Sequence, residues 1–120
     1  MAECDREFEM NRANTQGYVT CVGNALETYA DALDRRVVDL PQPLRGVSAF
    51  IREAARRVRA SRMVSEARAA VGTAIREVLK VIALLRADEP TAARIQVRLG
   101  NRIEAALQSV ENRLAKAGGL

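Results

Sequence analysis

Histidine and tryptophan are absent from this chain of 120 residues, and aromatic residues make up only 3% of it. Histidine is the side chain that most often serves as a general base near neutral pH and as a ligand of transition metals. A chain without histidine lacks the usual centre of acid–base and metal chemistry, which argues against most classes of enzyme. We therefore expect a protein with no catalytic residues, no metal and no cofactor.

Cysteine is scarce, since only Cys4 and Cys21 occur, and the first fifteen residues are acidic rather than apolar. Such a beginning does not resemble a secretory signal, so we expect both thiols to be reduced packing residues in the cytoplasm. The most apolar stretch, residues 78–85, is interrupted by Lys80. It is also far shorter than the roughly 20 residues that span a bilayer, so we expect no membrane segment.

Proline occurs only three times and glycine seven times, whereas 48% of the residues are hydrophobic, mainly Ala, Val, Leu and Ile. This aliphatic composition is typical of helical bundles. Strong helix breakers occur only at residues 39–43 and 88–90 and at the C-terminal Gly118-Gly119 pair. Because no segment alternates with period two, we predict an all-α protein without a sheet. Residues 1–120 are expected to form one domain of three long helices, at about 4–38, 44–87 and 89–117.

The apolar stripe of the middle segment changes direction partway along. Residues 47–58 place their apolar side chains on one face, and residues 64–85 place theirs on a face rotated by roughly 110°. The stretch from Ala60 to Ser65 contains no Gly, Pro or Asn. We therefore favour an unbroken helix of ~43 residues, about 65 Å long, whose halves bury different faces. The alternative is a kink near Ser61–Ser65 that closes a monomeric four-helix bundle.

An unbroken middle helix would form two antiparallel hairpins that point in different directions, each with one open apolar side. A second copy of the chain would complete the helical bundle, so we expect a homodimer or a larger homo-oligomer with coiled-coil-like packing. The stretch 78–85 supports this, because a helix that is apolar all round is normally buried all round. The predicted oligomer core consists of Val71, Ile75, Val78, Ile82 and Leu85.

Charge is distributed unevenly along the chain, although the net charge is only +4. Residues 1–39 hold four Arg against eight acidic residues, whereas residues 40–120 hold fifteen cations against seven acidic residues. Helical spacing predicts a basic stripe at Arg45, Arg52, Arg56 and Arg59 and an acidic stripe at Glu27, Asp31 and Asp34. Both stripes lie opposite apolar faces, so we expect that they cannot pair within one hairpin. They would pair with another chain or partner, or simply be solvated.

The last 30 residues resemble the helix-turn-helix end of winged-helix regulators, in which a Leu-Gly turn precedes a recognition helix that ends at glycine. Leu99-Gly100 and Gly118 match these positions. The resemblance implies a turn at Gly100 and places Arg102 and Arg113 near DNA. Residues 101–106, however, continue the helical period directly after Gly100. In the other interpretation, Gly100 is a point of close packing between helices.

These features predict a small, non-enzymatic adaptor or accessory module that acts through protein–protein interaction, with an unidentified protein partner. The alternative is a DNA-binding regulator or nucleoid-type protein that uses the basic stripe or the winged-helix-like tail.

Overall fold

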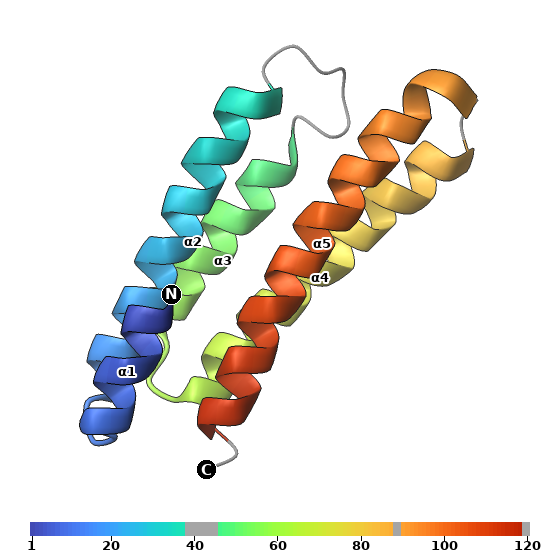
Figure 1. Cartoon of the computed structure of the whole chain (residues 1–120). Coiled ribbons are helices and arrows are strands. Elements are labelled where there is room, and N and C mark those ends of the chain that lie inside the picture. The colour runs from blue at the N-terminus through green and yellow to red at the C-terminus, as the bar shows by residue number, and fades with distance from the viewer. Residues whose placement is uncertain (38–45, 88–89, 119–120) are drawn as a thin grey trace.

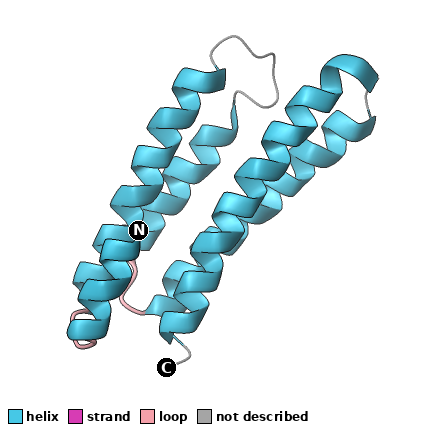
Figure 2. Cartoon of the chain, in the orientation of Figure 1, coloured by secondary structure: helices cyan, strands magenta, loops and turns pink. Residues whose placement is uncertain are grey.

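The computed structural model describes residues 1–37, 46–87 and 90–118, which form five helices and no strand. Figures 1 and 2 show these helices: α1 (Ala2–Met10), α2 (Thr15–Val37), α3 (Val47–Ala60), α4 (Val64–Ala87) and α5 (Pro90–Gly118). The all-α prediction is confirmed. The prediction of three long helices is wrong, because the first two of them are each divided, whereas α5 matches the third. Arg45, Asp88 and the breaker run 39–43 lie outside the described residues.

The first predicted helix is divided at a short turn between α1 and α2. Asn11 ends α1 with φ −146° and ψ 83°, outside the helical region. Asn14 begins α2, because its side-chain oxygen accepts a hydrogen bond from the Gly17 backbone N–H at 3.0 Å. Asparagine is one of the best residues for such a helix cap. As a result α1 folds back beside the first turns of α2 (Figure 1).

This reversal joins Cys4 to Cys21 in a disulfide bond, with their Cα atoms 5.7 Å apart. The prediction of two reduced thiols is therefore wrong. A continuous helix would have separated these two residues by about 25 Å at 1.5 Å per residue, so the pairing depends on the turn. The sequence spacing alone does not reveal it.

The second predicted helix is divided at Ser61, which has the extended conformation φ −71°, ψ 140°. The Ser61 hydroxyl donates to the backbone oxygen of Arg57 at 2.8 Å, and its N–H donates to Val58 at 3.1 Å. These bonds satisfy carbonyl groups at the end of α3. The prediction of an unbroken middle helix is therefore wrong. The break lies in the stretch Ser61–Ser65, where the alternative placed a kink. The rotation of the apolar stripe explains the corner, because turning there lets both faces reach one core.

The five helices form a rod of 50 × 24 × 20 Å. Helices α2 and α3 make one antiparallel hairpin, α4 and α5 make another, and α3 packs against α4 (Figure 1). Every one of α2 to α5 contributes fully buried aliphatic side chains to the core. The largest of these are Leu26, Ile51, Ile103, Leu107 and Leu114. A single chain therefore forms a four-helix bundle, with α1 added outside it.

The five residues of the predicted oligomer core are buried within this single chain, with exposed fractions from 0% for Val71 to 7% for Leu85. The prediction that a second copy is needed to complete the helical bundle is therefore wrong. Leu79 and Leu84 in the same helix are 46% and 61% exposed, so the stretch 78–85 is not buried all round. Association of copies through some other surface stays a prediction.

Gly100 lies in the middle of α5 and marks close packing against α4. A Cβ atom at this position would lie 2.8 Å from Cγ1 of Ile82. Because α5 continues without interruption through Gly100, the turn implied by the winged-helix resemblance does not exist. None of the described helices has both the length and the apolar character needed to cross a membrane.

Candidate functional site

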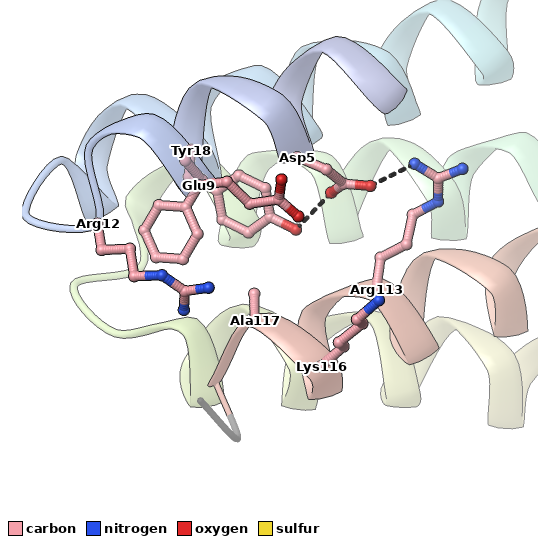
Figure 3. A pocket seen from close by; sticks show the side chains of 8 residues that line it. Asp5, Glu9, Arg12, Tyr18, Arg113, Lys116 and Ala117 are labelled. Carbon is pink, nitrogen blue, oxygen red and sulfur yellow. Dashed lines mark hydrogen bonds and ion pairs between the residues drawn. The ribbon is translucent and has the colours of Figure 1, made fainter.

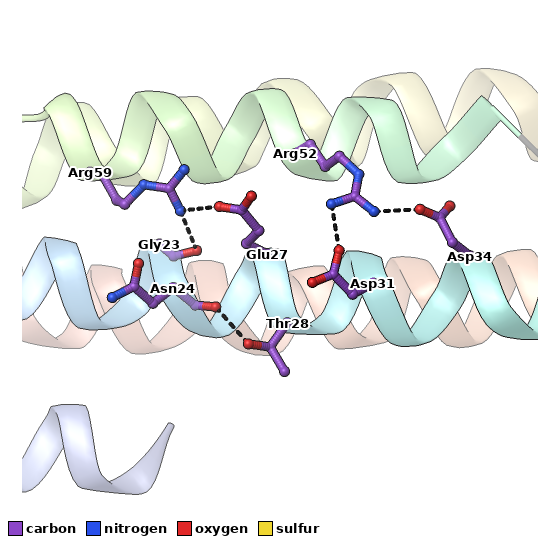
Figure 4. A network of polar contacts seen from close by, with 8 residues as sticks. All are labelled: Gly23, Asn24, Glu27, Thr28, Asp31, Asp34, Arg52 and Arg59. Atoms are coloured by element: carbon purple, nitrogen blue, oxygen red, sulfur yellow. Dashed lines mark hydrogen bonds and ion pairs between the residues drawn. The ribbon is translucent and has the colours of Figure 1, made fainter.

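The predicted acidic and basic stripes meet each other within the α2–α3 hairpin (Figure 4). Arg52 bridges Asp31, at 2.6 Å between Nη1 and Oδ1, and also pairs with Asp34. Arg59 pairs with Glu27, at 2.5 Å between Nη1 and Oε2. The expectation that the stripes cannot pair within one hairpin is wrong. Long arginine side chains reach around the flank of the helix contact to the acids of the antiparallel neighbour.

Arg56 pairs instead within its own helix. Its Nη2 lies 2.5 Å from Oε1 of Glu53, and Nε of Arg57 lies 3.0 Å from the same oxygen. Hydrogen bonds from Arg56 and then Arg57 lower the pKa of Glu53 to about 2. Hydrogen bonds from Ser48 and then from Arg52 likewise lower the pKa of Asp34. The acids therefore stay ionised well below neutral pH, and the described arginines of the basic stripe are already matched by carboxylates.

A different surface, along the line where α2 and α5 face each other, is only partly covered by the part of the chain that the structure describes. The other neighbouring helices of the bundle pack closely, but α2 and α5 make few direct contacts. We call this line the seam and define it as residues 18–36 of α2 and 98–117 of α5. It contains two hollows of about 240 Å³ each, and Arg113 lines both of them. The seam thus has an upper half toward Arg36 and a lower half toward Tyr18.

The lower half of the seam is covered by α1 (Figure 3). The Tyr18 hydroxyl donates to Oδ1 of Asp5 at 2.9 Å, and Arg113 Nη1 donates to Oδ2 of the same carboxylate at 2.6 Å. The Phe8 ring stacks on Tyr18 with 4.5 Å between centroids. Burial, together with the hydrogen bond to Asp5, raises the pKa of Tyr18. The phenol is therefore neutral at physiological pH and serves as a donor to α1.

Helix α1 is an acidic amphipathic helix. Its buried residues are Cys4 and Phe8, and both face α2. Its remaining surface carries four carboxylates, those of Glu3, Asp5, Glu7 and Glu9, against one arginine. The lower half of the seam therefore already binds a helix of this chemical type, with an arginine of α5 receiving one of its carboxylates.

The upper half of the seam has a similar surface, and no helix formed by the described residues covers it. Its hollow has mainly apolar walls, formed by Met1, Ala25, Leu26, Tyr29, Ala106, Leu107, Ser109, Val110 and Arg113. Burial raises the pKa of Tyr29, and the charge of Arg36 opposes that shift, which places Arg36 close to the Tyr29 ring. The floor of the upper half is thus apolar, with a cation on its α2 side.

Arginines also line the α5 side of the upper half. Arg102 precedes Arg113 by eleven residues, about three helical turns, so both lie on the same edge of α5. Arg98 lies one turn further along. Arg36, Arg98 and Arg102 are exposed, and none forms an ion pair with another described residue.

Sequence reasoning selected Arg102 and Arg113 only through the winged-helix resemblance, and it did not connect them with Arg36. The arginine spacing in α5 can be read from the sequence. The position of α2 beside α5 cannot, because it depends on the corner at Ser61.

Comparison of the chain with models of known protein families, with curated proteins and with solved structures finds no match. Among the residues that the structure describes, no group of three or more His, Cys, Asp or Glu could hold a metal ion.

Proposed function

We propose that this chain is a non-enzymatic interaction module that holds an acidic amphipathic helix of a partner protein in the upper half of the seam. The observation that carries the proposal is α1, an acidic helix that lies on the continuation of the same seam and pairs with Arg113 through Asp5. The upper half offers an apolar floor between Arg36 on α2 and Arg102 on α5. This combination favours a helix with an apolar face and carboxylates on its flanks.

The dimensions of the upper half define the ligand further. From Ala25 to Arg36 the wall of α2 contains twelve residues, and its ends lie about 16 Å apart at a rise of 1.5 Å per residue. It would accommodate roughly three turns of a partner helix. Apolar contacts with the partly exposed Ala25, Tyr29 and Ala106 would supply affinity, while the arginines on the rim would set orientation and speed association.

A synthetic peptide tests this proposal directly. The probe has eleven residues, with leucines three or four positions apart, glutamates on both flanks and a side-chain lactam that holds it helical. We expect the full-length, disulfide-bonded protein to bind it, as measured by fluorescence anisotropy. The double variant Arg36→Glu/Arg102→Glu should weaken binding at least tenfold, because two attractive rim charges become repulsive.

The matched control is Arg76→Glu/Arg86→Glu on α4, which changes the net charge equally but lies away from the seam. We expect its affinity to stay within twofold of the unaltered protein. An equal loss of affinity in both variants would show that overall charge causes the effect, and would reject the seam as the binding site. A dimer of this chain that the peptide dissociates would identify a second copy as the natural occupant, against the proposed partner.

Nucleic acid is the second candidate, favoured by a row of arginines on α5. Arg94, Arg98 and Arg102 are exposed at four-residue intervals and form no ion pair with any described residue. If this row contacts phosphates, affinity for duplex DNA should fall by about 0.9 log unit per contact for each tenfold rise in salt. Replacing all three by Ala should flatten that slope in a mobility-shift assay. Absence of binding at 50 mM salt would reject this candidate.

We propose a cytoplasmic location, and this location bears on the redox behaviour of the Cys4–Cys21 disulfide. Lasting disulfides are usual in oxidising compartments, whereas those of cytosolic proteins are mostly transient and serve catalysis or redox sensing. In the cytoplasm we therefore expect Cys4 and Cys21 to alternate between paired and reduced states.

A further inference from the structure

The disulfide joins the helix that covers the lower half of the seam to one wall of that seam. Helix α1 has nine residues, and isolated helices shorter than about 12–15 residues are marginal in water. Only Cys4 and Phe8 among them are buried. Its polar contacts with other described helices, through Tyr18 and Arg113, both end on the single carboxylate of Asp5. The covalent bond is therefore the strongest attachment of α1.

We propose that Cys4–Cys21 is a redox latch: the disulfide holds α1 on the lower half of the seam, and reduction releases α1 and opens the whole seam to a longer acidic helix. The choice of ligand rests on the proposed function, whereas the release of α1 can be tested without any ligand.

The reductant is a dithiol, and it attacks the more accessible sulfur. Cys4 is only 3% exposed, whereas Cys21 is partly exposed. One thiolate of the dithiol bonds to Sγ of Cys21, and the Cys4 sulfur leaves as a thiolate that takes up a proton. The second thiolate then closes the disulfide of the reductant and releases Cys21 as a thiol. Two electrons and two protons pass to the protein, and the dithiol is oxidised.

Release of α1 would change both the length and the charge of the seam. From Tyr18 to Arg36 the wall of α2 contains nineteen residues, and its ends lie about 27 Å apart, compared with about 16 Å for the upper half alone. Asp5 would leave with α1, so Arg113 would be free to join Arg36 and Arg102 in pairing with a ligand. The apolar face of Tyr18, which stacks on Phe8 in the latched form, would become available as well.

Hydrogen exchange followed by mass spectrometry tests the release. The full-length protein is compared in its disulfide form, in excess dithiothreitol, and as the Cys4→Ser/Cys21→Ser variant. We expect amides in α1 to exchange at least a hundredfold faster in the last two samples, while those of α3 and α4 change by less than threefold. Continued protection of α1 would overturn the latch. Loss of protection throughout the chain would also overturn it, by making the disulfide a staple of the whole fold.

Two peptides of different length test the opening of the seam. Both are lactam-stapled, with leucines on one face and glutamates on the flanks, and they contain 11 and 18 residues. Reduction should raise the affinity for the longer peptide at least tenfold and leave that for the shorter one within twofold. An unchanged affinity for the longer peptide would overturn the opening. If neither peptide binds either form, the proposed function fails, while hydrogen exchange still decides the latch.

Discussion

Replacing Leu107 by Ala is expected to lower the free energy of unfolding by about 2–5 kcal/mol, because the variant loses buried methyl groups and leaves a cavity. Leu107 lies in the middle of α5 and is fully buried, at 0% exposure. The matched change Leu84→Ala removes the same atoms from a side chain that is 61% exposed. It should alter the free energy of unfolding by less than about 0.5 kcal/mol. Urea unfolding at neutral pH measures both values.

The same pair of variants tests whether a second chain covers α4. Suppose that Leu84→Ala lowers the free energy of unfolding as much as Leu107→Ala does, and that the unfolding midpoint rises with protein concentration. The outer face of α4 would then be buried in an oligomer. A small effect of Leu107→Ala, below about 1 kcal/mol, would instead contradict the assignment of Leu107 to the core.

The helical class and the extent of α5 could be predicted because aliphatic residues repeat with the helical period throughout, and no other element competes. The corner at Ser61 could not be placed from local signals. Ser61, Arg62 and Met63 form a turn without Gly, Pro or Asn, so burial of both apolar faces outweighs local helix propensity. The rotated apolar stripe shows only that the two halves of the segment bury different faces. It fits either one straight helix with two partners or one corner with a single core, and sequence spacing alone does not choose between them.

The break before α2 has a clearer signal in the sequence. Asn11 and Asn14 bracket the turn, and asparagine is a preferred cap. Cys4 and Phe8 project onto the apolar line of α2, which favours a continuous helix on a helical projection. The projection gives an angle around one axis and does not distinguish continuation of the helix from a return along its side. The disulfide was hidden for the same reason.

The candidate site was only partly predictable. A helical projection places the charged stripes opposite the apolar faces but ignores the reach of an arginine side chain, so the pairing of Arg52 with Asp31 was missed. The seam requires knowing that α2 and α5 are neighbours, since Arg36 and Arg102 are distant in sequence. That adjacency follows from the corner at Ser61, which sequence reasoning gave only as the alternative to an unbroken helix.

A pair of glycine-to-alanine substitutions tests how closely α2 approaches α3, because we expect them to change the free energy of unfolding in opposite directions. A Cβ atom at Gly23 would lie 2.9 Å from the backbone oxygen of Ala55 and 2.3 Å from Cγ of Arg59. The arginine can move, but the backbone of α3 cannot move without shifting the helix. We expect Gly23→Ala to lower the free energy of unfolding by about 1–2 kcal/mol, since overpacking exceeds the gain of about 1 kcal/mol in helix propensity.

Gly72 on α4 provides the matched control, because the nearest atom to a Cβ there is Nη1 of Arg76, at 3.7 Å. Gly72→Ala therefore gains helix propensity without a clash and should raise the free energy of unfolding by up to about 1 kcal/mol. Thermal and urea unfolding of the two variants measure both changes. Stabilisation by both substitutions would mean that α2 and α3 lie further apart than the Arg59–Glu27 and Arg52–Asp31 pairs require. The hairpin that forms one wall of the seam would then be placed incorrectly.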